Sequence, residues 1–179
     1  MASYTFRKKK AFSLADRQGF DINIIKHHFN GCVNVVKTDL KMDRTGVDYI
    51  ATLDKGAEIY IDAKARERGA SRFWSGEPEL ALEIWSVIPD GQQEGKQGWT
   101  LSESTLVDYI LYTFDASDSE QYYILPFQLL RKAFIHRFWL WKQQYGSWTQ
   151  NSVRWRSESM FVPASVVIQA VSEEMMGVA

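Results

Sequence analysis

Residues 46–65 have the sequence GVDYIATLDKGAEIYIDAKA, and this stretch decides the fold predicted for the chain. Two short runs rich in β-branched and aromatic residues stand on either side of Asp-Lys-Gly at 54–56, which is a typical hairpin turn. A three-residue loop with Gly56 in the left-handed conformation places Asp48 directly opposite Asp62. The stretch therefore predicts an antiparallel hairpin that carries two facing carboxylates.

Strand alternation puts Lys64 on the same face as Asp62, about 7 Å further along the strand. Facing carboxylates in an antiparallel pair lie roughly 5 Å apart and repel each other. Mg²⁺ or Mn²⁺ would offset that repulsion and would bring a phosphate oxygen into its ligand shell. Lys64 would then orient or deprotonate the attacking water. Asp48, Asp62 and Lys64 are the predicted catalytic residues. The alternative is a surface hairpin with scattered charges. The arrangement also depends on register, since a slip of one residue would move Asp48 to the other face.

These residues resemble the signature of the PD-(D/E)XK nuclease superfamily, which includes many restriction enzymes, Holliday-junction resolvases and phage recombination nucleases. Asp48 matches the first acid of that signature, Asp62 the second acid and Lys64 the lysine, while Val47 stands where the family name has proline. The resemblance covers roughly residues 15–125. It implies a restriction-endonuclease-like α/β fold, in which helices flank a central mixed sheet.

The resemblance also implies further groups near the metal. The backbone carbonyl of Ala63 corresponds to an additional metal ligand. Many members carry an acid on the helix that precedes the sheet, for which Asp16 and Asp21 are the candidates. Independently of the resemblance, alternation in 79–88 leaves Glu83 either as an additional acid beside the metal or as an edge-strand charge.

The remaining elements follow from periodicity and turn signals. Apolar residues at helical spacing predict helices over 15–29 and 127–144, the second with a core-facing apolar stripe. Alternating or apolar runs predict further strands, with 79–88 as the third or fourth; these runs lie at 32–36, 79–88, 106–114 and 121–125.

Composition is consistent with one domain over 1–179, with residues 1–14 as a candidate flexible basic arm and 160–179 as a C-terminal helix or tail. Cys32 is the only cysteine, which excludes an intramolecular disulfide and a Cys-based zinc site. The basic N-terminus lacks the apolar core of a signal peptide, and no run approaches a membrane span. We therefore expect no membrane partner and a cytoplasmic protein, in the host cell if a phage encodes it.

Charge is unevenly distributed although the formal net charge is only -1. The segment 127–156 contains no Asp or Glu and carries a local charge of +6. Such a cluster can follow a phosphate backbone, whereas the alternative is a solvated helix face. The predicted nucleic-acid-binding residues are Arg131, Lys132, Lys142, Arg154 and Arg156.

Three tryptophans lie among these cations, at positions 139, 148 and 155. They would either stack on unpaired bases or fill the core of a small domain, and we expect the second role.

The sequence thus predicts a Mg²⁺- or Mn²⁺-dependent DNA endonuclease. Its small size favours a structure-selective or accessory nuclease of a phage or mobile element, and family analogy predicts a homodimer if both strands are cut. The alternative is a catalytically inactive module on the same scaffold, which binds nucleic acid or inhibits a protein.

Overall fold

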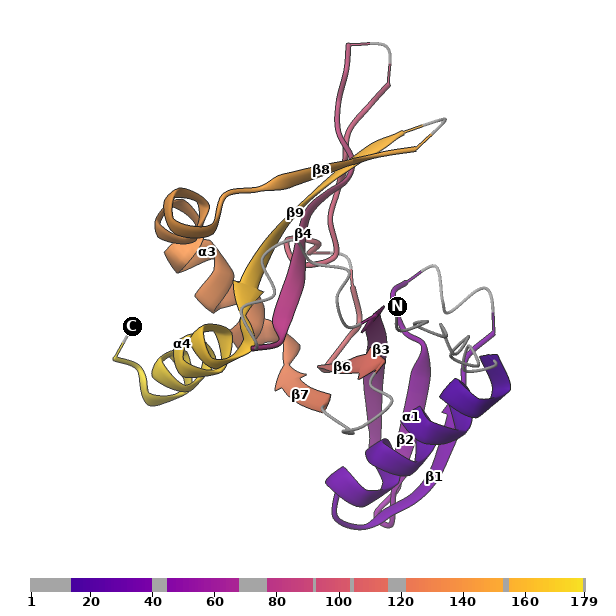
Figure 1. Ribbon diagram of the computed structural model, residues 1–179. Helices are drawn as coiled ribbons and strands as arrows, with labels where there is room; N and C mark the ends of the chain where they lie inside the picture. The colour runs from indigo at the N-terminus through magenta and orange to yellow at the C-terminus, as the bar shows by residue number, and fades with distance from the viewer. Residues whose placement is uncertain are drawn as a thin grey trace, which may run out of the picture.

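The computed structural model describes residues 14–39, 45–67, 77–91, 93–103, 105–115, 122–152 and 155–178. Within these residues the chain forms a mixed α/β fold with two sheets and three helices (Figure 1). The helices are α1 (Leu14–His28), α3 (Phe127–Tyr145) and α4 (Ala164–Met176). The predicted basic arm lies almost entirely outside the described residues.

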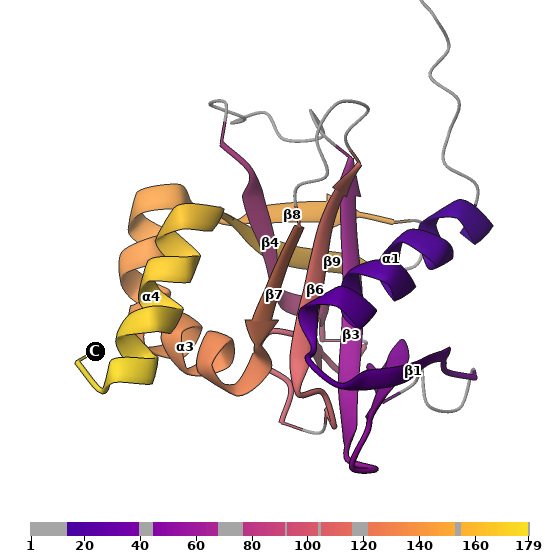
Figure 2. The ribbon, with the colours of Figure 1, turned by 90° about the horizontal axis from the view of Figure 1, so that it is seen from below.

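The first sheet is mixed, as predicted. Its strands are β1 (Cys32–Lys37), β2 (Tyr49–Leu53), β3 (Glu58–Glu67), β6 (Tyr109–Asp115) and β7 (Tyr122–Pro126). They lie in the order β1-β2-β3-β6-β7, in which β3 and β6 are parallel and all other neighbours are antiparallel. Helix α1 covers one face of this sheet (Figure 2).

The β2–β3 hairpin has the predicted register. The backbone N–H of Leu53 donates to the carbonyl of Ala57 at 2.9 Å, and Gly56 adopts a left-handed φ of 80°. Tyr49 pairs with Ile61, as predicted. The backbone N–H of Asp48 also donates to the carbonyl of Ile61, so the regular ladder ends at Tyr49 and Asp48 lies beside Asp62 without standing directly opposite it. The loop length therefore sets the relative position of the two acids.

A second, four-stranded sheet was not predicted. It has the order β5-β4-β9-β8 and consists of β4 (Glu79–Val87), β5 (Lys96–Gln97), β8 (Trp148–Asn151) and β9 (Arg156–Pro163). The prediction that 79–88 forms a strand is confirmed, but it pairs with β9 and β5 instead of joining β3. Alternation within one strand predicts its faces and contains no information about a partner far along the chain.

Two hydrophobic clusters hold the layers together. The smaller one lies between α1 and the first sheet and includes Ile24, Ile25 and Ile61. The larger one joins both sheets to α3 and α4. The predicted apolar stripe of α3 is confirmed, because Phe127, Leu130, Phe134 and Trp141 are buried there and Phe138 packs against them.

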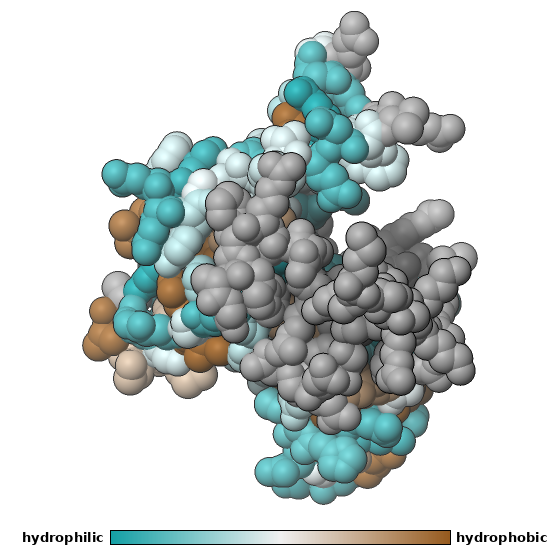
Figure 3. Space-filling view, in the orientation of Figure 1, coloured by the Kyte–Doolittle hydropathy of each residue, from teal (hydrophilic) through white to brown (hydrophobic). Residues whose placement is uncertain are grey.

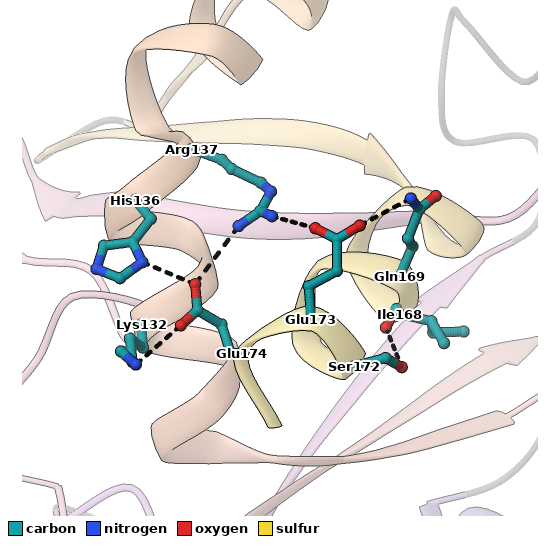
Figure 4. Close-up of polar contacts among 8 residues, drawn as sticks. All are labelled: Lys132, His136, Arg137, Ile168, Gln169, Ser172, Glu173 and Glu174. Carbon is teal, nitrogen blue, oxygen red and sulfur yellow. Dashed lines mark hydrogen bonds and ion pairs between the residues drawn. The ribbon is translucent and has the colours of Figure 1, made fainter. Parts of the chain in front are cut away.

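Helix α4 is fastened to α3 by a buried carboxylate (Figure 4). The side chain of Glu174 is fully buried and accepts from Nδ1 of His136 at 2.7 Å. Lys132 lies 3.0 Å from its other oxygen, and Arg137 approaches at 3.5 Å. Arg137 also pairs with Glu173. The acids of α4 therefore neutralise cations of α3.

We expect Glu174→Ala to lower the melting temperature by several degrees, because three partners lose a buried acceptor and the space it filled is left empty. Lys132→Ala is the matched control. Its side chain is 53% exposed, so its loss should cost much less. Thermal unfolding followed by circular dichroism measures both, and equal shifts would contradict the importance of Glu174.

Candidate active site

Asp48 and Asp62 meet where β2 begins. The backbone N–H of Asp48 donates to Ile61 at 2.9 Å, and its carbonyl accepts from the N–H of Thr38 on the β1 side, also at 2.9 Å. The side-chain Oδ2 of Asp48 accepts a hydrogen bond from the backbone N–H of Ala63 at 2.8 Å. This contact fixes the first acid against the backbone that follows the second.

Asp62 is almost completely buried beside one cation and one acid. Its Oδ1 lies 2.7 Å from Nζ of Lys64, and its carboxyl group shares a hydrogen bond with that of Asp48. Burial raises the pKa of Asp62 to about 7; the charge of Lys64 opposes the rise, and the hydrogen bond and charge of Asp48 add to it. The structure therefore brings together Asp48, Asp62 and Lys64, as the sequence predicted.

Asp21 of α1 points toward the same place, whereas the side chain of Asp16 lies outside the described residues. Oδ2 of Asp21 accepts from the hydroxyl of Tyr49 at 3.1 Å. Its Oδ1 is buried and has no hydrogen-bond partner among the described residues. Burial raises the pKa of Asp21, and the charge of Asp48 contributes to this rise. The resemblance suggested this residue only as one of two candidates.

A small cavity of about 180 Å³ lies between Asp21 and Asp48 on the α1 side of the sheet. Asp21 and Asp48 supply its acids, and Arg17 and Lys37 supply its cations. Sequence reasoning did not find Arg17 or Lys37 as site residues, because neither belongs to the signature.

Lys64 lies between Asp62 and an aromatic ring on the opposite side of the sheet. Its Nζ is 5.7 Å from the ring centroid of Trp99, which is partly buried against the larger core. Within the loop that carries Trp99, Gly98 approaches the backbone closely, because an added Cβ would lie 2.3 Å from the carbonyl oxygen of Glu83. Trp99 is therefore held in a fixed place beside the lysine.

Glu83, the additional candidate ligand, binds this loop. Its Oε2 accepts from the Ser86 hydroxyl at 2.6 Å and from the backbone N–H of Trp99 at 3.2 Å. Its contacts thus reach Lys64 only through the ring of Trp99. Among the described residues, no group of three or more His, Cys, Asp or Glu side chains is arranged to hold a metal ion.

Three of the five predicted nucleic-acid-binding cations form ion pairs with acids: Arg131, Lys132 and Lys142. Arg131 lies 2.8 Å from Glu103, and Lys142 lies 3.5 Å from Glu158. Lys132 pairs with Glu174, as described above. The positive excess counted along 127–156 is thus reduced in space, because distant segments supply carboxylates. Arg156 is exposed on β9, and Arg154 lies outside the described residues.

The expectation that three tryptophans fill the core is wrong. Trp139 is 78% exposed, Trp148 43% and Trp155 48%. The core is closed by Trp141 and the phenylalanines of α3 instead.

Comparisons with protein-family models, curated proteins and solved structures find no match to this chain. Within the described part of the chain, no helix is both long enough and apolar enough to span a membrane.

The raised pKa of Asp62 predicts a pH dependence of stability in EDTA. Between pH 3.8, the ordinary pKa of an aspartate, and about pH 7, Asp62 keeps its proton in the folded state and releases it in the unfolded chain. Wild-type stability should therefore fall through this window relative to Asp62→Asn, by at most about 1.4 kcal/mol for each unit of pKa. Urea unfolding of both proteins at several pH values measures the difference. Parallel stability curves would contradict the shift.

Proposed function

We propose that this protein is a metal-dependent nuclease that hydrolyses phosphodiester bonds of DNA. The observation that carries the proposal is the closeness of the carboxyl groups of Asp48 and Asp62, with Lys64 bonded to the second acid. The α/β fold with a mixed sheet supports the more specific assignment to a restriction-endonuclease-like fold. The order of β1, β2 and β3 before the parallel strand β6 is compatible with it.

The residues present fit a hard divalent cation. Mg²⁺ requires only one or two carboxylates and retains several waters. Asp48 and Asp62 provide such a pair. Burial raises the pKa of Asp62 and the nearby Asp48 adds to the rise, so a cation bound there would favour the ionised form of Asp62. The unpartnered buried oxygen of Asp21 is a further acceptor near Asp48. The carbonyl of Ala63 remains the proposed backbone ligand.

When bound, Mg²⁺ or Mn²⁺ would supply Lewis-acid activation of the phosphate and a more acidic water. Lys64 is already placed by Asp62 and by the ring of Trp99, so it would meet the attacking water or the developing negative charge with little loss of side-chain freedom. Arg17 and Lys37 line the cavity beside Asp48, on the other side of the sheet from Lys64.

The first experiment compares wild type with Lys64→Ala and Lys55→Ala on linear, single-stranded and four-way-junction DNA in Mg²⁺, Mn²⁺ or EDTA. We expect metal-dependent cutting by wild type and a loss of roughly 100-fold or more in Lys64→Ala, because a positioned proton-transfer group contributes about that much. Lys55 is exposed in the loop of the same hairpin, so its variant should cut normally.

Binding of DNA without cutting by wild type, in both metals, would overturn the proposal. It would favour the alternative, a catalytically inactive binding module on this scaffold.

A thermal-shift titration tests the metal ligands separately from activity. We expect Mg²⁺ or Mn²⁺ to stabilise wild type at pH 7.5, by about 2.7 kcal/mol at one hundred times the dissociation constant. Asp48→Asn should remove the shift. Glu83→Gln should retain it, because Ser86 and Trp99 already engage that carboxylate. A shift that survives Asp48→Asn but disappears in Glu83→Gln would place the cation elsewhere.

A further inference from the structure

The β8–β9 hairpin carries two exposed tryptophans on one face. Trp148 pairs with Ser159 in the ladder, and the backbone N–H of Ser152 donates to the carbonyl of Trp155 at 2.9 Å, which continues the same register. Directly opposed residues share a face, and alternate residues of one strand return to it. Trp148 and Trp155 therefore lie on the same face, four residues or about 13 Å apart along the strands.

This face is continuous with the surroundings of the candidate active site. Ser159 pairs with Trp148 on one side and with Glu83 of β4 on the other, so the three residues form one row across the sheet. Adjacent strands are about 4.8 Å apart, which puts Trp148 roughly 10 Å from Glu83. Glu83 holds Trp99, and the ring of Trp99 lies beside Lys64. The row thus leads from the candidate site to the hairpin.

The hairpin projects from the body of the molecule, with the end of β4 beside it (Figure 1). The outer surface of the projection is mostly hydrophilic in the space-filling view (Figure 3). The tryptophans are therefore carried on an arm that extends beyond the packed layers.

The groups between the two rings are polar and uncharged. Gln150 pairs with Ser157 on this face, between the positions of the tryptophans. The only acid of the two strands, Glu158, belongs to the opposite face and lies 3.5 Å from Nζ of Lys142. The centre of a protein–protein interface is usually apolar between its aromatic anchors. Exposed rings with hydrogen-bonding groups between them suit the stacking of unpaired bases. Arg156, like Glu158, belongs to the opposite face.

We propose that this arm binds unpaired nucleotides of the nucleic acid whose phosphodiester bond enters the candidate active site. Trp148 and Trp155 stack on bases of a single strand. The inference rests on the nuclease proposed above and specifies its substrate as DNA with a single-stranded end, flap or branch.

The experiment measures binding of fluorescein-labelled dT20, the corresponding U20 and a 20-base-pair duplex to the full-length protein in EDTA, by fluorescence anisotropy. We expect Trp148→Ala and Trp155→Ala each to weaken dT20 binding about 5- to 100-fold, as for other base–aromatic stacks. Duplex binding should change little. The U20 arm tells whether the surface separates DNA from RNA.

Matched variants separate stacking from other effects. Trp139→Ala removes an equally exposed tryptophan from α3, which is outside the row that leads to Lys64, and should bind dT20 like wild type. Trp155→Tyr keeps an aromatic face and should retain most of the affinity. The tryptophan variants should leave the slope of log K against log salt unchanged, because they remove no phosphate contact.

Three results would overturn the inference: unchanged dT20 binding in the double variant Trp148→Ala/Trp155→Ala, an equal loss for the duplex, or an equal loss in Trp139→Ala. These results do not depend on cleavage. If wild type cuts DNA but the arm variants bind dT20 normally, the proposed role of the arm is wrong and the proposed nuclease activity stands. If nothing is cut but the tryptophans carry dT20 binding, the nuclease fails and the arm stands as a single-strand-binding surface.

Discussion

The register of the β2–β3 hairpin is the constraint on which the candidate site depends. A three-residue loop that ends at Gly56, in the left-handed conformation, pairs Tyr49 with Ile61 and so brings Asp48 beside Asp62. A slip of one residue would turn one acid to the other face and leave the other alone. Because the acids lie close together in a buried place, their electrostatics follow: one carboxyl group keeps its proton to about pH 7, and Lys64 and the N–H of Ala63 are recruited as partners.

Strand β3 also divides the site into two sides. Ala63 and Ala65 face α1, and their small side chains leave space for the cavity lined by Arg17 and Lys37. Asp62 and Lys64 alternate with them and face the second sheet, where Trp99 lies. Asp48 reaches both sides, because it lines the cavity and bonds to the carboxyl group of Asp62.

Local signals predicted the parts of the structure that are local. The hairpin, α1 and the apolar stripe of α3 each depend on residues within about twenty positions, and periodicity and turn chemistry describe them well. The partner of β4 could not be predicted, because β9 follows it by more than seventy residues. The neutralisation of cations on α3 could not be predicted for the same reason. Glu174 lies outside the basic segment in sequence and becomes its neighbour only when α4 packs against α3. Asp21 joined the acids through packing of Ile24 and Ile25, which the signature does not contain.

Exposure of the tryptophans has a related cause. From the sequence alone, each aromatic residue is a candidate for the core. In the structure Trp141 of α3 is buried, whereas Trp139 of the same helix is exposed. Since β8 and β9 extend beyond α3 and α4, no helix or sheet of the described residues covers the outward face of their hairpin. Paired cations on α3 and exposed rings on the hairpin together change where nucleic acid would be held. Contact through Lys132 of α3 would compete with an ion pair that holds α4. Contact through the tryptophan face of the hairpin leaves the ion pair of Glu158 and Lys142 on the other face intact and leads toward Lys64.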